Sequence, residues 1–246
     1  MPKRLIVFLL LIFMTVSPAI AQEAIHAGVA ANFIQPFKEI AALFERESGV
    51  KVTSTFTSSG SLYSQVTNGA PYDIVLSADE ERPQKLFDQG FSGKPFVYAK
   101  GFAALWTAKK DLCGLSSWKD VVRSASVKKI AIAHTVNAPY GTSAMEALKA
   151  EGLWQGCQNR LVVAQTVAQS FQFAVAEAVD AAFCAKSATL SAEGAKGCAW
   201  TIDAAPAIVQ GACILKSSKN TALVQKFADF LGGKEAKAVL EKYGYR

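Results

Sequence analysis

Four short clusters of small and hydroxyl residues carry the chemistry that this sequence suggests. Each cluster follows an apolar, strand-like run and leads directly into a helical pattern. The clusters are Ala31-Asn32, Thr57-Ser58-Ser59-Gly60, Asn137 to Thr142, and Thr166-Val167-Ala168. The first turn of a helix leaves backbone N–H groups without partners and carries about half a positive charge. Several helix N-termini that meet at one point would bind a small oxyanion without lysine or arginine.

The first third of the chain predicts strands and helices in alternation around the first two clusters. Phe33 begins an amphipathic helical pattern that Gly49 is placed to end. The predicted order is strand 25–30, this helix, strand 52–56, helix 61–67, strand 73–77 and helix 80–89. A βαβαβα series of this kind requires a mainly parallel sheet that is covered by helices on both faces.

A second lobe is expected to repeat this plan. The long apolar segment 96–108 is predicted to leave one lobe and enter the other, and 202–215 is the predicted return strand. Between them, the predicted order is strand 129–133, helix 142–151, strand 161–164, helix 168–178 and strand 181–185. The prediction is α/β, with two lobes that are each a mainly parallel sheet flanked by helices, two crossover strands, and a ligand between the lobes. A single doubly wound sheet is the alternative.

The expected domain boundaries follow from these crossings and from the N-terminus. An apolar run at 5–14 follows two basic residues, and Ala19-Ile20-Ala21 supplies the pattern that a signal peptidase cuts before Gln22. The run is too short to span a bilayer comfortably, so we expect a signal peptide at 1–21 and export to the periplasm. The mature chain is then divided into the first part of lobe 1, lobe 2, and the return strand with the C-terminal helices, at 22–100, 101–203 and 204–246.

The charge and the motifs argue against several other functions. The formal net charge is +6, but the lysines are spread along predicted helices and loops, so no nucleic-acid partner is expected. An exported hydrolase is the alternative from another class. The only histidines are His26 and His134, neither has a neighbouring ligand at metal spacing, and no GxSxG or HExxH motif is present. We therefore expect no enzyme activity and no cofactor.

Five cysteines in an exported chain allow disulfides and leave at least one thiol free. Cys213 lies in an alternating apolar run, where a small buried side chain fits, so it is the expected free thiol. The pairs then expected are Cys113–Cys157 and Cys184–Cys198.

Several phrases of the sequence resemble the molybdate-binding periplasmic proteins of ABC transporters, the ModA family. They are Ala30-Ala31-Asn32-Phe33, the segments 56–62 and 68–79, Ala138-Pro139-Tyr140-Gly141, and the ending Tyr243-Gly244-Tyr245. Their order and spacing make the match specific, and the resemblance covers essentially the whole mature chain. It implies the type II periplasmic-binding-protein fold, with molybdate captured in the cleft between the lobes and delivered to an ABC importer.

The resemblance also implies which residues bind the anion. Ala31 and Asn32 fall at the first junction, where the family uses an amide and a polar side chain, and Ser59 matches a serine at the second junction. Tyr140 matches an amide and a tyrosine hydroxyl in the second lobe, and Val167 matches a further amide. These residues would contact the oxygens of molybdate, with no direct ligand to the metal.

The chain departs from the family pattern at the end of strand 181–185. One branch of the family has its binding tyrosine there, and Ala185 occupies that place, so the chain resembles the branch with Asn32 and Tyr140. Lys186 follows where related sequences carry an apolar residue. We expect Lys186 to point to solvent, and a cation at the rim of the cleft is the alternative.

Neutral donors suit a tetrahedral dianion in a dry cleft. Charge-assisted hydrogen bonds contribute about 1.5–3 kcal/mol each, and a helix terminus adds about 0.3–1 kcal/mol. A smaller sulfate would leave donors unpaired, and phosphate would need an acceptor such as a carboxylate for its proton. Tungstate is nearly equal to molybdate in size and charge, so both are expected ligands, with sulfate or another small anion as the alternative. The lobes are expected to close on the anion, and the closed monomer to dock on a membrane permease.

Overall fold

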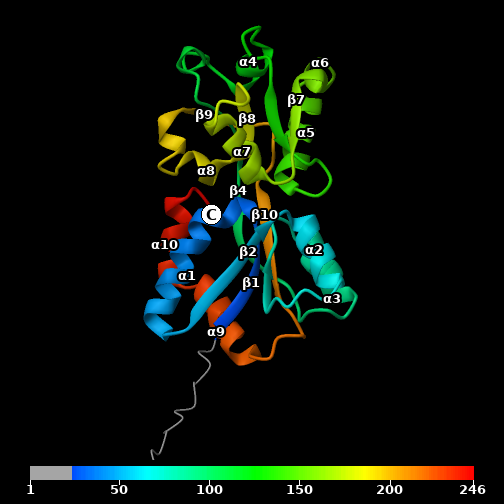
Figure 1. Ribbon diagram of the computed structural model, residues 1–246, viewed down its shortest axis with the longest axis vertical. Coiled ribbons are helices and arrows are strands. Elements are labelled where there is room, and N and C mark those ends of the chain that lie inside the picture. Colours follow the sequence, from blue (N-terminus) through cyan, green and yellow to red (C-terminus); the bar gives the residue numbers. More distant parts are fainter. Residues whose placement is uncertain (1–23) are drawn as a thin grey trace, which may run out of the picture.

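Two lobes, each built on its own sheet, form the part of the protein that the structure describes. The computed structural model describes residues 24–246, so the expected signal peptide and its cleavage after Ala21 lie outside the described residues. Within 24–246, helices flank two five-stranded sheets, and the lobes stack along the long axis of the molecule (Figure 1). The two-lobed α/β prediction is confirmed. No helix in this range has the length and apolar character that a membrane span requires.

The first sheet has the strand order β2-β1-β3-β10-β4. Its strands are β1 (Ala24–Ala30), β2 (Lys51–Thr57), β3 (Ile74–Leu76), β4 (Phe96–Gly101) and β10 (Ile208–Ile214). β1 pairs in parallel with β2 and β3, and Val29 lies in register with Phe56 and Leu76. β10 runs antiparallel to both β3 and β4. The carboxyl ends of β1, β2 and β3 therefore meet at one edge of the sheet.

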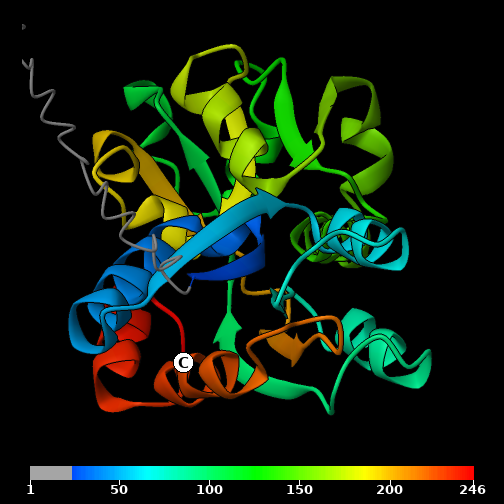
Figure 2. The ribbon, with the colours of Figure 1, turned by 60° about the horizontal axis from the view of Figure 1, so that its bottom comes forward.

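Helices cover both faces of this sheet and complete the first lobe. They are η1 (Ala31–Phe33), α1 (Ile34–Ser48), α2 (Ser59–Thr67), α3 (Glu81–Asp88), α9 (Thr221–Leu231) and α10 (Lys234–Lys242). Figure 2 shows α1, α9 and α10 together on one side, and α2 and α3 on the other. Phe37, Ile40 and Phe44 of α1 are buried, and Gly49 ends the helix with a φ of 73°, a conformation that glycine adopts without strain.

The second sheet has the matching order β7-β6-β8-β5-β9. Its strands are β5 (Ala103–Thr107), β6 (Ile130–Ala133), β7 (Leu161–Ala164), β8 (Ala181–Ala185) and β9 (Cys198–Thr201). β6 pairs in parallel with β7 and β8, whereas β5 runs antiparallel to β8 and β9. The helices of this second lobe are η2 (Lys110–Leu112), α4 (Trp118–Arg123), α5 (Pro139–Ala150), α6 (Trp154–Cys157), η3 (Gln158–Arg160), α7 (Val167–Val175), α8 (Lys186–Thr189) and η4 (Gly194–Lys196).

The chain crosses between the lobes at two places, and both crossings interrupt a predicted strand. The run 96–108 is divided into β4 of the first sheet and β5 of the second, with Phe102 between them. The predicted return strand 202–215 is shorter than expected, because the chain crosses at 202–207 and β10 begins in the first sheet only at Ile208. β9, which ends in the second sheet at Thr201, was not predicted. Each strand pairs within a single sheet, so a change of sheet ends the strand.

The disulfide pairing differs from the prediction. Cys113, directly after η2, is bonded to Cys198 at the start of β9, so the predicted pairs Cys113–Cys157 and Cys184–Cys198 are wrong. Cys157, Cys184 and Cys213 are free and buried. Only Cys213 had been predicted to be free. The reason lies in the sheet, because β9 pairs with β5 and η2 follows β5 along the chain. The two bonded cysteines are 85 residues apart in sequence, and cysteine spacing alone does not indicate that the strand pairing brings them together.

Candidate anion-binding site

One small cavity between the lobes collects residues from all four junctions. It is lined by Ala30, Ala31, Asn32, Ser58, Ser59, Ala78, Ala138, Pro139, Tyr140 and Val167. The structure thus brings together all five residues that were predicted to bind the anion. The volume of the cavity is about 10 Å³, so the two lobes lie close together around it. None of these described lining residues carries a charge. We call this space the anion cavity.

Each lobe directs two helix N-termini at the anion cavity. In the first lobe, η1 follows β1 at Ala31 and α2 follows β2 at Ser59. In the second lobe, α5 follows β6 at Pro139 and α7 follows β7 at Val167. The two strands in each lobe are parallel neighbours, so the helices that follow them start side by side. α2 begins two residues earlier than predicted and α5 three residues earlier, so Ser59 and Tyr140 each lie in the first turn of a helix.

The caps of these helices leave backbone donors at the cavity. Ser58 Oγ accepts from the N–H of Ser61, and Thr166 Oγ1 accepts from the N–H of Gln169. Over the described range, η1 and α5 have no side-chain cap. First-turn N–H groups have no intrahelical acceptor. The N–H of Gly60 already donates to the carbonyl oxygen of Asn137, and Pro139 has no N–H, so only the remaining first-turn amides are available to an anion.

Ser59 is held in place from within the first lobe. Its side chain is buried, and its Oγ accepts a hydrogen bond of 2.9 Å from the N–H of Ala78. Ala78 follows β3, so this bond fixes the hydroxyl between the ends of two strands. The hydroxyl proton is not used in that bond, and it remains available to an anion.

Asn32 directs its side-chain donor toward other protein groups. Its Nδ2 donates to Gln210 Oε1 at 2.8 Å and to Tyr245 Oη at 3.0 Å. The orientation of Gln210 is fixed in turn, because its Nε2 donates to the carbonyl oxygen of Ile208 at 2.7 Å. In this arrangement Asn32 offers the anion its backbone N–H, while its Oδ1 has no partner among the residues that the structure describes.

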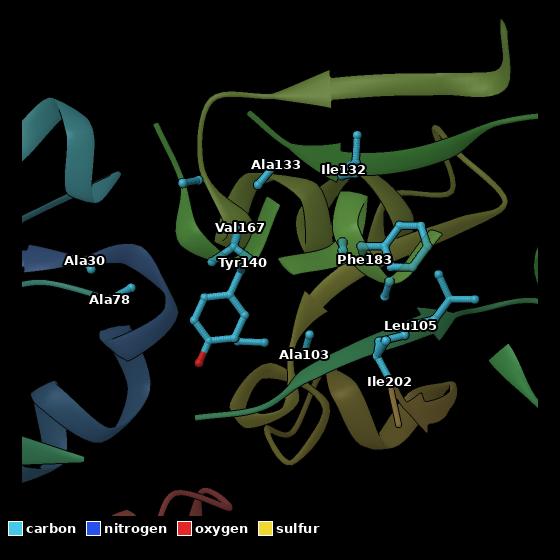
Figure 3. Packing of buried hydrophobic residues seen from close by; sticks show 14 of the residues in the cluster. Ala30, Ala78, Ala103, Leu105, Ile132, Ala133, Tyr140, Val167, Phe183 and Ile202 are labelled. Carbon is cyan, nitrogen blue, oxygen red and sulfur yellow. The ribbon is translucent and has the colours of Figure 1, made fainter. Parts of the chain in front are cut away.

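Tyr140 places an unpaired hydroxyl between the lobes. The residue is 3% exposed, and its Oη has no hydrogen-bond partner in the described part of the chain. Figure 3 shows its ring beside Val167, with the hydroxyl pointing away from Phe183 in the core of the second lobe. Burial, and then the neighbouring Tyr245, raise the pKa of Tyr140 well above its ordinary value, so the hydroxyl keeps its proton. An unpaired buried hydroxyl costs about 1–3 kcal/mol, and an anion that accepted a hydrogen bond from it would remove this cost.

Gly101 makes room for this hydroxyl at the first crossing. A Cβ atom at position 101 would overlap Tyr140 Oη and crowd the ring of Tyr245. Since Gly101 is the last residue of β4, the tyrosine of the second lobe rests against the strand through which the chain leaves the first lobe.

Lys186 does not line the anion cavity. It is half-buried, and its Nζ lies 5.8 Å from the centroid of the Phe102 ring, at the first crossing. The next residue, Ser187, connects the lobes, since its Oγ donates to the carbonyl oxygen of Asn32 at 2.9 Å. Tyr245 Oη donates to the same oxygen at 2.9 Å.

Three of these residues were missed by sequence reasoning, namely Ser187, Gln210 and Tyr245. The signal for Gln210 is present in the sequence, because it is a polar residue within the apolar strand β10. A buried polar side chain at such a position needs hydrogen-bond partners, and Asn32 and Ile208 supply them.

The two histidines are engaged elsewhere. His26 Nε2 lies 3.2 Å from Thr55 Oγ1 within the first sheet, and His134 Nδ1 accepts from the backbone N–H groups of Val136 and Asn137. Within 24–246, no group of three His, Cys, Asp or Glu residues is arranged to hold a metal ion. The site therefore consists of backbone amides and hydroxyls.

Two α/β lobes with a donor-lined cavity between them are the architecture of a solute-binding protein. The sequence pattern of the family described as bacterial extracellular solute-binding protein matches residues 25–246, and the chain belongs to that family. The family is one of binding proteins, which confirms the expectation that this chain is no enzyme.

Named relatives narrow the resemblance further. The chain is 38% identical to the molybdate-binding protein ModA of Rhodobacter capsulatus over 232 residues, which cover 93% of this chain and 90% of that protein. It is 35% identical to ModA of Azotobacter vinelandii, with 92% and 91% of the two chains covered. The solved structure of the periplasmic molybdate-binding protein of Azotobacter vinelandii matches with a TM-score of 0.85 at 33% identity, covering 90% of this chain and 98% of that one. The resemblance to the ModA family is thereby confirmed.

The fold itself is shared more widely. The sulfate-binding protein SubI of Mycobacterium tuberculosis matches with a TM-score of 0.75 at 13% identity, with 91% of this chain and 86% of that chain covered. At this identity the likeness concerns the fold alone, so the choice of anion must be argued from the site.

Proposed function

We propose that this protein captures molybdate between its two lobes and delivers it to an ABC importer. The relatives at 35% and 38% identity are named molybdate-binding proteins. The single observation that carries the proposal is the anion cavity, because five predicted ligand residues from four distant junctions line one buried space. We assign the anion-binding role to Ala31, Asn32, Ser59, Tyr140 and Val167.

The donors are neutral and come from both lobes. The first lobe supplies first-turn amides and the hydroxyl of Ser59, and the second lobe supplies first-turn amides and the hydroxyl of Tyr140. Charge-assisted hydrogen bonds of about 1.5–3 kcal/mol each would replace the lost hydration of a dianion. Since one anion would accept from both lobes at once, its binding favours the closed arrangement over the open one.

Direct contacts between the lobes support a closing movement. Gly60 N donates to the carbonyl oxygen of Asn137 at 2.9 Å, and Arg82 Nη2 donates to the carbonyl oxygen of Val136 at 2.7 Å. Ser187 makes its bond to Asn32 from the second lobe. These bonds would form as the lobes approach, and the closed form would be the one that a membrane permease accepts.

The selectivity follows from fixed donor positions. Tungstate would bind like molybdate, because the two anions are nearly equal in size and charge. A smaller sulfate would leave at least one buried donor unpaired, at a cost of about 1–3 kcal/mol, or about tenfold to a hundredfold in affinity. Phosphate would bring a proton that needs an acceptor, and no carboxylate lines the anion cavity.

Calorimetric titration of the mature protein with molybdate, tungstate, sulfate and phosphate tests this function. We expect molybdate and tungstate to bind with similar affinity, and sulfate and phosphate to bind at least about tenfold more weakly. Tighter binding of sulfate would assign the protein to that anion instead. The absence of heat with all four would contradict the proposal.

Two further measurements concern export and closure. Mass spectrometry of the protein recovered from the periplasm should give a mature chain that begins at Gln22. Small-angle scattering should show a monomer that becomes more compact when molybdate is added, and an unchanged radius of gyration would contradict closure.

A further inference from the structure

His134 lies in the loop between β6 and α5, residues 134–138, which we call the closing loop. Its Nδ1 accepts hydrogen bonds from the backbone N–H groups of Val136 at 3.2 Å and Asn137 at 3.3 Å. A ring nitrogen that accepts carries no proton, so the imidazole is neutral in this arrangement, with its proton on Nε2. The two bonds fold the loop back onto the ring.

The residues that His134 holds are also those that reach the first lobe. The carbonyl oxygen of Val136 accepts from Arg82 Nη2 at 2.7 Å, and that of Asn137 accepts from Gly60 N at 2.9 Å. The peptide group between Val136 and Asn137 is thus held at both ends, its N–H by His134 and its C=O by Arg82. The fit is close, since a Cβ atom on Gly60 would lie 2.9 Å from Asn137 Oδ1.

We propose that His134 is a positioning residue for anion capture, whose neutral ring holds the closing loop in the shape that meets the first lobe. This inference rests on the proposed function, because the loop leads into α5, where Tyr140 lines the anion cavity. Histidine ordinarily changes charge between about pH 5 and pH 8. A protonated Nδ1 donates and cannot accept, so a protonated ring could not make either bond to the loop. The new positive charge also lies next to the N-terminus of α5, where a cation is unfavourable.

The charged residues around the closing loop lie at α3 and α5 rather than on the neighbouring strands. β6, β7 and α7 carry no Asp, Glu, Lys, Arg or His, and no ion pair that includes His134 occurs over residues 24–246. The titratable groups on the other elements around the loop are Tyr63 on α2, Tyr140, Glu146 and Lys149 on α5, and, at or on α3, Asp79, Glu80, Glu81, Arg82, Lys85 and Asp88. Four of the α3 group form the ion pairs Asp79–Arg82 and Glu81–Lys85. His134 is the only histidine of this group, and it makes the direct contacts to the loop.

A matched pair of variants separates positioning from a general effect of acid. In His134→Asn, the side-chain oxygen can accept from N–H groups two and three residues further on, as in an Asx turn, and it does not titrate. His134→Ala has no acceptor. Molybdate affinity is measured by calorimetry for the wild type and both variants at about pH 7.5 and pH 5.5, on the two sides of the ordinary histidine range. The asparagine variant also controls for protonation of molybdate itself.

We expect the wild type to bind molybdate about tenfold more weakly at the lower pH, through the loss of two hydrogen bonds. His134→Asn should match the wild type at the higher pH and change much less on acidification, and His134→Ala should bind weakly at both. Parallel changes in the wild type and His134→Asn would overturn the proposal. Tighter binding by the wild type in acid would also overturn it.

A second readout keeps this inference separate from the choice of ligand. If the wild type gives no heat with molybdate at the higher pH, the proposed function fails, and the role of His134 is then tested in the ligand-free protein. Amide hydrogen exchange should show that Val136 and Asn137 lose protection between the two pH values in the wild type but keep it in His134→Asn. Equal behaviour of the two proteins would overturn the positioning role.

Discussion

The two lobes contribute similar helix N-termini to the anion cavity, but the side chains that they contribute differ. Their sheets have matching strand orders, and each lobe contributes one capped and one uncapped N-terminus. In the first lobe, Ser59 and Asn32 are already hydrogen-bonded to other groups of the protein. In the second lobe, the buried hydroxyl of Tyr140 has no partner among the described residues. The first lobe is therefore pre-arranged by its own contacts, whereas the second carries a buried donor that is free to bind a ligand.

The lobes also differ in how their chains are tied together. The second lobe contains the Cys113–Cys198 disulfide. In the first lobe the C-terminus serves as a tie, because Arg246 and Lys100 exchange two backbone hydrogen bonds beside the crossing. Figure 1 shows the C-terminus at the level where the lobes meet. Substitutions at these positions should therefore differ in whether they change the free energy of unfolding, the affinity for the anion, or both.

The largest expected effect concerns the disulfide. Replacing both partners, Cys113→Ala with Cys198→Ala, should lower the free energy of unfolding of the second lobe by about 4 kcal/mol, because the bond closes a long loop in the unfolded chain. All four tryptophans lie in the second lobe, at positions 106, 118, 154 and 200, so their fluorescence during urea unfolding reports on that lobe. Dithiothreitol should destabilise the wild type and leave the double variant unchanged. An unaltered unfolding midpoint in the variant would contradict the expectation.

Ser59→Ala should reduce both molybdate affinity and stability. The variant loses one donor to the anion, about tenfold to a hundredfold in affinity, and leaves the buried N–H of Ala78 without its acceptor, at a cost of about 1–3 kcal/mol. Calorimetry and urea unfolding measure the two effects. Ser64→Ala, an exposed position on the same helix, is the control and should change neither. A variant with full stability but weak binding would mean that the bond to Ala78 contributes little.

Tyr140→Phe should reduce affinity alone. The variant loses one charge-assisted hydrogen bond to the anion, about tenfold in affinity, while the free protein loses only a buried hydroxyl that has no partner. Its free energy of unfolding should equal or exceed that of the wild type. A loss of stability as large as that of Ser59→Ala would contradict the proposed difference between the lobes.

The last effect is expected in alkaline solution. Burial raises the pKa of Tyr98 and Tyr140 well above the ordinary value, and burial raises that of Tyr245 as well. Unfolded tyrosines release their protons near pH 10, so the unfolded state binds fewer protons above that pH and the free energy of unfolding falls as pH rises. Each group contributes up to about 1.4 kcal/mol per pH unit. Tyr140→Phe should make this fall shallower, and an identical slope in urea unfolding would contradict the assignment.

Sequence reasoning located the backbone part of the site more fully than its side-chain part. The junctions at Ala31, Ser59, Tyr140 and Val167 could be predicted because helices that follow parallel strands start at one edge of a sheet, and the family resemblance supplied their roles. The contact between Asn32 and Gln210 joins residues 178 apart in sequence, and no local pattern reveals such a pair. The disulfide of Cys113 is missed for the same reason.

The strand predictions failed where the chain changes sheet, and β9 (Cys198–Thr201) was not predicted. The apolar run 96–108 has no turn signal at its middle, yet Phe102 separates two strands that pair in different lobes. Apolar residues run through both strands, although β5 is fully buried and β4 only in part, so the apolar pattern does not mark the crossing. The break depends on which strands are neighbours in space.

The central claim is that neutral donors from both lobes enclose one tetrahedral dianion. Diffraction from crystals grown with molybdate, recorded at a wavelength where molybdenum scatters anomalously, would locate the metal directly. We predict one peak inside the anion cavity, with oxygens that accept from the hydroxyls of Ser59 and Tyr140 and from first-turn amides of both lobes. A peak beside surface lysines, or a cavity that stays empty at saturating molybdate, would contradict this account.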